Sequence, residues 1–317
     1  MRGARGASAR RLTSPIADLL RERLARREWT VTVEVVTPPR GDDHARARIL
    51  ALAASLRDDD RVAALTLTDR TTTDDTDDVV GLGAVVAAAS GAMPLVHIAG
   101  KRRGRDDLLT LLARLRGAGL TSVLLTGGDT GDTARDYDAV AMLRDGAVSV
   151  PDFLLLGVVE PRPGPLDETR ARVAAKRDAA VRPGAAAPLL TLVAQVTWDV
   201  ALREDVAGWQ RDLGVPMLGA VMWLTRKRLE FLAAHAIGGI VVPPSLRRRL
   251  NGESPEAAQH RLALDLVALR RLGYAGAHIS GLLTPARITA VLDEAGRLDA
   301  TLGHDWREVW REAVGIA

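Results

Sequence analysis

The chain contains 317 residues, 47% of them apolar, and its 43 basic and 40 acidic residues leave a formal net charge of +3. An apolar fraction of this size is typical of a folded globular protein. Because cysteine is absent, a disulfide framework, a thiolate metal site and a cysteine nucleophile are excluded, and we expect a cytoplasmic location. No apolar run reaches the roughly 20 residues that a membrane-spanning helix needs, so we expect no membrane contact.

The charge pattern argues against nucleic acid as a partner. Aromatic residues make up only 3% of the chain. The basic clusters at residues 101–103 and 247–249 lack the interleaved aromatic rings of a platform that binds single strands. A basic pocket for a small polyanion, such as a dinucleotide or a glutamate tail, fits these clusters better.

Short runs rich in β-branched residues alternate with segments of helical period along the chain. The predicted strands are residues 31–36, 63–68, 94–99, 122–126, 153–159, 189–196, 216–222 and 277–282. Such alternation predicts a parallel sheet covered by helices. A further short run at 240–242 is either an extra strand or a loop, because Pro243 and Pro244 end it.

Eight strand and helix units predict an α/β protein with a single (β/α)8 barrel, the TIM barrel, which typically needs about 250 residues. The alternative is a doubly wound open sheet. However, no G-x-G-x-x-G follows the first strand, and no phosphate-binding G-x-x-x-x-G-K-[ST] occurs in the chain. Internal linkers are not evident, so we expect residues 16–317 to form one catalytic barrel and the basic segment 1–15 to be a flexible tail.

Glu34 is the one carboxylate in the first predicted strand, which is otherwise rich in valine. An ionised carboxylate is costly to bury without a partner. Side chains alternate along a strand, so Val33 and Val35 share one face while Thr32, Glu34 and Val36 share the other. Glu34 is therefore predicted to point away from the helix layer, unless the strand is an edge strand with a solvated second face.

Other polar residues lie at the C-terminal ends of the predicted strands, where barrel enzymes carry their chemistry. They are Asp69, His97, Asp129, Glu160, Gln195 and Asp199. Asp69 and Asp199 fit turn or helix caps better than catalysts, and His97 fits a core histidine as well as a ligand-binding one. Two glycines before Asp129 would let the backbone approach a flat ligand closely. No spacing of His, Asp or Glu indicates a metal site.

Six short motifs occur in a fixed order between residue 31 and about residue 284. They are Val33-Glu34-Val35-Val36-Thr37-Pro38-Pro39-Arg40, Leu67-Thr68-Asp69, Val96-His97-Ile98, Gly128-Asp129, Lys176-Arg177-Asp178-Ala179 and Ala194-Gln195-Val196-Thr197-Trp198-Asp199. In order and spacing they resemble the methylenetetrahydrofolate reductase family. No single motif is specific, and the resemblance rests on their succession.

The resemblance implies a (β/α)8 barrel that reduces the methylene group of 5,10-methylenetetrahydrofolate to the methyl group of 5-methyltetrahydrofolate. In this chain Glu34 would be the general acid that opens the ring between N5 and N10 of the folate. Asp129 would stabilise positive charge, and Asp129, Gln195 and Thr68 would bind the substrate. Burial among valines is expected to raise the pKa of Glu34 towards the working pH.

The resemblance also implies a hydride from NADH or NADPH, in the family usually carried by FAD. The implied cofactor-binding residues are His97, Gly127, Gly128, Glu160 and Lys176. Several positions that contact flavin in the family differ here, including Gly127, Val158, Arg162, Thr169 and Arg172. These differences favour a variant without flavin, in which hydride passes directly from the nicotinamide to the folate. The alternative function is a folate-binding or methyl-transfer barrel without redox activity, and the oligomeric state stays open.

Overall fold

The computed structural model describes most of the chain. The described residues are 16–69, 75–100, 103–126, 139–145, 154–159, 166–180, 190–235, 240–281 and 284–314, with the backbone alone at 154–159 and 234–235. The expected tail, residues 1–15, lies outside the described residues. So do four of the predicted site residues, Gly127, Gly128, Asp129 and Glu160.

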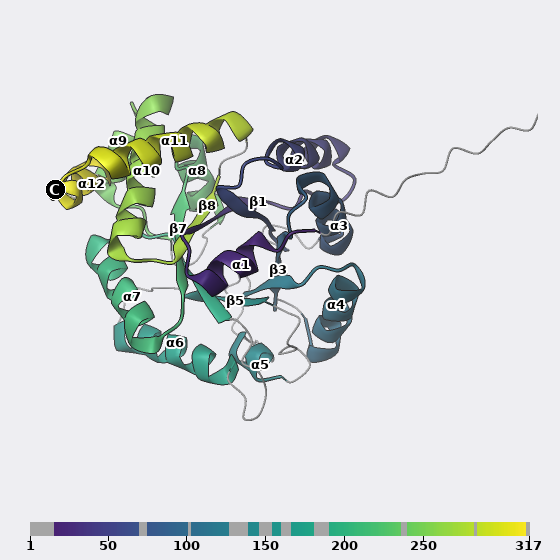
Figure 1. Cartoon of the computed structure of the whole chain (residues 1–317). Coiled ribbons are helices and arrows are strands. Elements are labelled where there is room, and N and C mark those ends of the chain that lie inside the picture. The colour runs from purple at the N-terminus through teal and green to yellow at the C-terminus, as the bar shows by residue number, and fades with distance from the viewer. Residues whose placement is uncertain are drawn as a thin grey trace, which may run out of the picture.

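Eight parallel strands close into a barrel in sequence order, with the last strand pairing with the first (Figure 1). They are β1 (Thr30–Val35), β2 (Val62–Leu67), β3 (Leu95–Ala99), β4 (Ser122–Thr126), β5 (Leu154–Val159), β6 (Leu190–Ala194), β7 (Met217–Met222) and β8 (Gly276–Ser280). The predicted (β/α)8 barrel is confirmed, and the open sheet is wrong. Each predicted strand boundary lies within two residues of the observed one.

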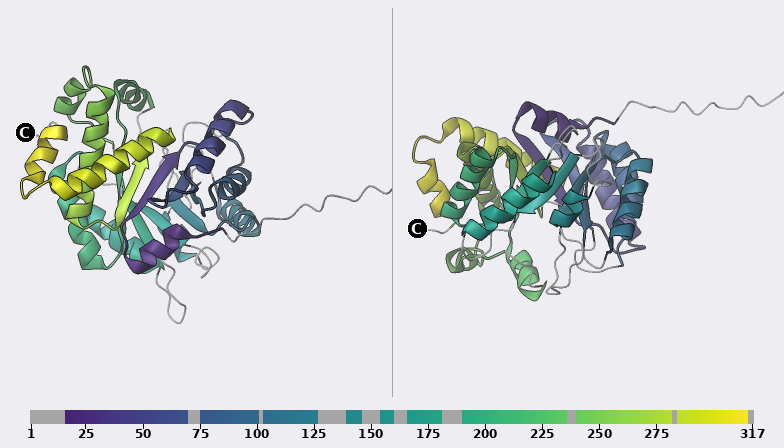
Figure 2. Two further views of the ribbon diagram at one scale, coloured as in Figure 1. Left: turned by 45° about the horizontal axis from the view of Figure 1, so that its top comes forward. Right: turned by 90° about the horizontal axis from the view of Figure 1, so that it is seen from below.

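Helices form a layer outside the strands in all three views (Figures 1 and 2). They are α1 (Leu19–Arg26), α2 (Asp43–Ser55), α3 (Val79–Ser90), α4 (Arg105–Gly117), α5 (Ala139–Arg144), α6 (Leu166–Ala180), α7 (Val200–Leu213), α8 (Arg226–His235), α9 (Pro244–Arg249), α10 (Pro255–Leu272), α11 (Pro285–Thr301) and α12 (Trp306–Val314). The run at 240–242 is a loop that leads into α9. No helix in the described part of the chain combines the length and apolar character needed to span a membrane.

The first helix, α1, lies across the N-terminal end of the barrel (Figure 1). Ala17 forms a bridge with Ala92 just before β3, and Ser122, the first residue of β4, donates a hydrogen bond to Asp18. Leu20 and Leu24 of α1 are buried and join the core. This end of the barrel is therefore covered, and the C-terminal ends of the strands form the opposite end.

A buried polar network connects three helices beside the barrel. Arg203 of α7 donates to Asp265 of α10 over 2.9 Å, and the indole of Trp310 on α12 donates to the same carboxylate over 2.8 Å. The hydroxyl of Tyr274, just before β8, donates to the backbone oxygen of Arg203. These buried hydrogen bonds and the ion pair connect the helices that support β7 and β8, although Nη2 of Arg203 and Oδ2 of Asp265 have no partner among the described residues.

Two aspartates that follow predicted strands have different structural roles. Asp199 accepts a hydrogen bond from the backbone of Leu202 and caps α7, as predicted. Asp69 caps no helix that the structure describes. Its buried carboxylate accepts hydrogen bonds from the backbone of Ala99 and from the guanidinium of Arg103, so it ties the loop after β2 to the loop after β3.

Candidate functional site

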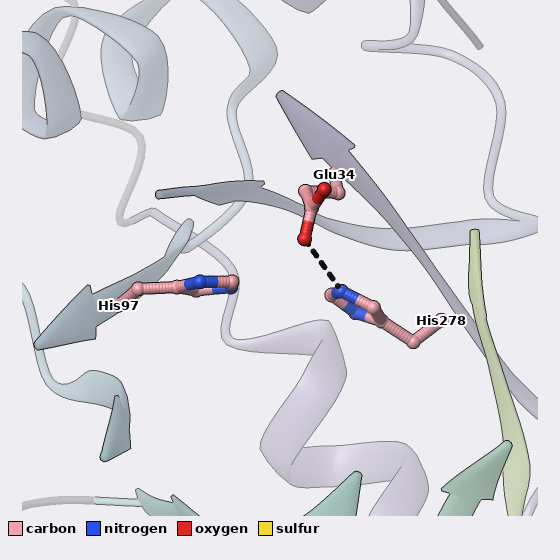
Figure 3. Close-up of side chains that lie close together, drawn as sticks. All are labelled: Glu34, His97 and His278. Carbon is pink, nitrogen blue, oxygen red and sulfur yellow. Dashed lines mark hydrogen bonds and ion pairs between the residues drawn. The ribbon is translucent and has the colours of Figure 1, made fainter. Parts of the chain in front are cut away.

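Glu34 faces the interior of the barrel near the C-terminal ends of the strands, opposite the end that α1 covers (Figure 3). We call this the open end of the barrel. Strand β1 pairs with β2 on one side and with β8 on the other, so the alternative of an edge strand is wrong. The Glu34 side chain is 23% exposed, and one of its oxygens, Oε2, lies 3.3 Å from Nε2 of His278. The carboxylate is thus partly withdrawn from water and has a specific partner.

Three side chains from distant strands meet at this point (Figure 3). Glu34 comes from β1, His97 from β3 and His278 from β8, and each has an oxygen or nitrogen atom within 4.8 Å of those of the other two. The centroids of the two imidazole rings are 5.9 Å apart. The structure therefore brings two predicted site residues together and adds His278, which the sequence analysis missed.

His278 connects Glu34 to the deeper interior. The register of β1 and β8 places it beside Thr32, whose hydroxyl lies 2.9 Å from its Nδ1. An ionised carboxylate only accepts hydrogen bonds, so Nε2 carries the hydrogen toward Glu34. Nδ1 can accept from the Thr32 hydroxyl or, when the ring is protonated, donate to it. The chain from Thr32 to His278 to Glu34 therefore accommodates both protonation states of the imidazole.

The expected rise in the pKa of Glu34 is wrong. Burial does raise the pKa of this carboxyl, but the hydrogen bond from His278 and the charges of His278, His97 and Arg228 outweigh it, and the net pKa lies below its usual value. Val33 and Val35 made the environment appear purely apolar, yet they lie on the other face of the strand. Glu34 is ionised at neutral pH in the absence of a ligand.

His97 is a buried imidazole that is not satisfied by the protein. It is 8% exposed, and its Nε2 has no hydrogen-bond partner among the described residues. Burial lowers the pKa of His97 to about 4, only partly opposed by the charge of Glu34, so the ring is neutral at neutral pH. A neutral ring with an unused nitrogen fits a ligand-binding residue better than a satisfied core histidine.

The other predicted site residues in the described part of the chain take more local roles. The Thr68 hydroxyl accepts a hydrogen bond from the backbone of Thr37 over 3.1 Å, which joins the loops after β1 and β2. Gln195 follows β6, is half-buried and accepts a hydrogen bond from the backbone of Val196. Lys176 is half-buried in α6, outside the strand layer. Their assignments to substrate and cofactor stay predictions, as do those of Asp129, Gly127, Gly128 and Glu160.

Of the basic cluster at 101–103, Lys101 and Arg102 lie outside the described residues, and Arg103 already has a partner in the protein. Arg103 from the cluster at 101–103 pairs with the buried Asp69, and its side chain is only 11% exposed. In the second cluster, Arg247 donates to the backbone oxygen of Val242. A different arginine, Arg228 of α8, acts on Glu34 electrostatically and was not identified from the sequence.

Two imidazoles and a carboxylate are also a donor set that transition-metal ions accept. Here Glu34 Oε2 and His278 Nε2 bond to each other, and Thr32 bonds to the remaining nitrogen of His278. These bonds use one oxygen of Glu34 and both ring nitrogens of His278, while Nε2 of His97 has no partner among the described residues. We therefore describe Glu34 and His278 as a hydrogen-bonded pair, and the expectation that the site holds no metal stays a prediction.

Comparisons with known proteins identify the fold. No protein-family model matches the chain, and no curated protein matches its sequence. The structure is similar to that of an uncharacterized protein from Clostridium thermocellum that binds two copies of 5-methyl-5,6,7,8-tetrahydrofolic acid, with a TM-score of 0.62, 13% identity and coverage of 89% of this chain and 100% of that one. It is also similar to a dihydropteroate synthase from Xanthomonas albilineans with 4-aminobenzoic acid, with a TM-score of 0.52, 16% identity and coverage of 86% and 92%. At these identities the similarity shows a shared barrel fold.

The low pKa of His97 predicts a specific loss of stability in mild acid. Between pH 6.5 and about 4 the unfolded chain binds a proton on this residue that the folded chain does not, so stability falls as the pH is lowered through that window. From pH 7 to pH 5 the loss due to this group is about 2 kcal/mol. The free energy of unfolding, measured in urea, should fall between pH 7 and pH 5 by about 2 kcal/mol less in His97→Gln than in the unaltered protein. The exposed His304→Gln is the control, and an unchanged pH dependence in His97→Gln would contradict the assignment.

Proposed function

We propose that this protein is a methylenetetrahydrofolate reductase that takes its hydride from NADH or NADPH. The observation that carries the proposal is the carboxylate of Glu34, held at the open end of the barrel in a hydrogen bond with His278. The sequence motifs around Glu34, His97 and Gln195 support it. The neighbouring structures support a folate ligand, since one binds 5-methyltetrahydrofolic acid and the other contains 4-aminobenzoic acid, which corresponds to the central part of folate.

The reaction requires a proton before it requires a hydride. In 5,10-methylenetetrahydrofolate one carbon bridges N5 and N10, and the bond from that carbon to N10 breaks when N10 receives a proton. The carbon then forms an iminium cation with N5. Hydride addition to this carbon gives the N5-methyl group, and the nicotinamide leaves oxidised. One proton and one hydride are consumed in each turnover.

Glu34 and His278 would supply the proton as a pair. Because Glu34 is ionised before the substrate binds, the proton available at this site is the one on His278 Nε2, which already points at Glu34 Oε2. When His278 starts as the imidazolium, transfer of this proton to Glu34 and from Glu34 to N10 leaves His278 neutral and Glu34 ionised again, and a proton from solvent restores the imidazolium.

A reduced nicotinamide supplies the hydride when it is bound. The unpartnered Nε2 of His97 is a suitable hydrogen-bond partner for a carboxamide or a flat heterocycle at the same end of the barrel. On α6, Thr169 is buried and accepts a hydrogen bond from Arg172, so both side chains that replace the family's flavin contacts are engaged with each other. This pairing supports the flavin-free variant of the proposal.

Replacement of Glu34 tests the acid role. Glu34→Gln keeps the size of the side chain but has no proton to transfer, so the rate of NADH oxidation that depends on methylenetetrahydrofolate should fall by about a hundredfold to ten-thousandfold. Glu230→Gln, an exposed substitution on α8, is the matched control. Full activity of a folded Glu34→Gln protein refutes the role. Folate binding without any NADH oxidation by the unaltered protein would favour the non-redox alternative.

Replacement of His278 tests the proton supply. His278→Gln keeps a donor near Glu34 but removes the imidazole whose hydrogen bond and charge lower the pKa of Glu34, so the pKa of this carboxyl rises and it must carry the proton alone. We expect kcat relative to the natural protein to be lowest near pH 8 and to recover as the pH falls toward 5.5, with little change in KM. The other groups that act on Glu34, His97 and Arg228, are unchanged in this variant. A kcat ratio that is constant with pH would assign His278 a merely structural role.

The absorbance spectrum of the purified protein tests the cofactor. A flavin-free reductase should be colourless, show no flavin bands and oxidise NADH or NADPH at a rate that added FAD does not change. A yellow protein with stoichiometric flavin and full activity would overturn the flavin-free variant while leaving the acid role of Glu34 in place.

A further inference from the structure

Arg228 occupies a defined place beside the ends of β7 and β8. It lies in the first turn of α8, where its backbone N–H donates to the hydroxyl of Thr225 over 3.3 Å. Its guanidinium packs over Gly281, which directly follows β8 and has a φ of +84°. A Cβ atom at position 281 would lie 3.2 Å from Arg228 Cζ, so glycine leaves the space that the guanidinium fills.

Among the described residues, none pairs with the guanidinium of Arg228. No hydrogen bond or ion pair in the described part of the chain uses any of its N–H groups. Other arginines nearby are paired: Arg226 binds Glu230 on the same helix, and the buried Arg261 binds Glu253. Arg228 is half-buried, and burial lowers its pKa while the charge of Glu34 raises it. A partly desolvated, unpaired cation is costly, which points to a partner that arrives from outside.

A second arginine lies close to the same strand end. Arg287, in the first turn of α11, places its guanidinium 5.3 Å from the ring centroid of Trp223, which follows β7. Arg287 is exposed and likewise has no carboxylate partner among the residues that the structure describes. The rim between β7 and β8 therefore carries two cations, of which Arg228 acts electrostatically on the anionic Glu34.

We propose that Arg228 binds an oxyanion of the ligand, a carboxylate or a phosphate, and so fixes the end of the ligand remote from its reacting carbon. The planar guanidinium suits such groups because two parallel N–H donors match two oxygens. The inference rests on the proposed function, under which the ligands carry such groups: the glutamate carboxylates of the folate and the phosphates of the dinucleotide. Glu34 does not neutralise Arg228 in place of the ligand, because its ion-pair partner is His278 and no ion pair joins it to Arg228.

Binding measurements on Arg228→Gln test the inference, with 5-methyltetrahydrofolate, 5-methyltetrahydropteroate without the glutamate, and NADH as probes. We expect Kd for an anionic probe to rise by about tenfold to a hundredfold, the loss typical of a charged hydrogen bond. The pteroate form keeps only the carboxylate of its benzoate, so a loss for 5-methyltetrahydrofolate but not for the pteroate form identifies a glutamate carboxylate as the ligand group. If the loss affects NADH alone, the phosphate is the group. Arg228→Lys should show a smaller loss, because the charge stays while the planar fork is gone.

Arg226→Gln is the matched control, because it removes the same charge from the same turn of α8 at an exposed position. Equal Kd values for all three probes in Arg228→Gln and Arg226→Gln would overturn the inference. The unfolding free energy of Arg228→Gln should be unchanged or higher, since no internal bond is lost, and a fall of several kcal/mol would assign Arg228 to the fold instead. If the unaltered protein binds none of the probes, the proposed function fails together with the inference. If the unaltered protein is active and Arg228→Gln leaves every Kd unchanged, only the inference is rejected.

Discussion

The hydrogen bond between His278 and Glu34 is the interaction on which the interior of this barrel depends. It joins residues 244 positions apart and can form only because β8 pairs with β1. A carboxylate withdrawn from water is strongly destabilising unless donors and opposite charges compensate it. The hydrogen bond from His278 and the charge of Arg228 compensate the desolvation of the Glu34 carboxylate. Closure of the barrel and ionisation of Glu34 therefore stabilise each other. Glu34, the residue whose burial in β1 costs most, is also the one placed where a ligand can reach it.

The strands and their order could be predicted because the signals that define them are local. Apolar runs between turn residues give each strand, and the repeated alternation with helical segments gives the barrel. Register across the closing pair is not local. His278 lies in a short apolar run that has the pattern of any buried strand, and only its pairing beside Thr32 shows that it faces Glu34. A titratable residue inside a predicted barrel strand, the criterion that singled out Glu34, would have identified His278 as well.

The wrong direction for the Glu34 pKa has the same physical origin. Its neighbours in sequence, Val33 and Val35, are apolar but lie on the opposite face of β1. Its neighbours in space come from β3, β8 and α8, and they are imidazoles and a guanidinium. The residues next to Glu34 in sequence indicate that its carboxyl is withdrawn from water. They do not indicate which side chains from other strands and helices bind it or act on its charge. Asp199 illustrates the converse case, because a helix cap requires only the next three residues and was predicted correctly.

The charges at the open end of the barrel also suggest how ligand binding and acid function are coupled. Before binding, Arg228 has no partner in the described part of the chain, and its charge helps to keep Glu34 ionised. An oxyanion seated on Arg228 would neutralise that charge, and the ligand would at the same time displace water from Glu34. Both changes raise the pKa of Glu34. The carboxyl would then accept a proton from His278 only when a substrate is in place, so that an acid forms beside the leaving nitrogen and not in the empty barrel.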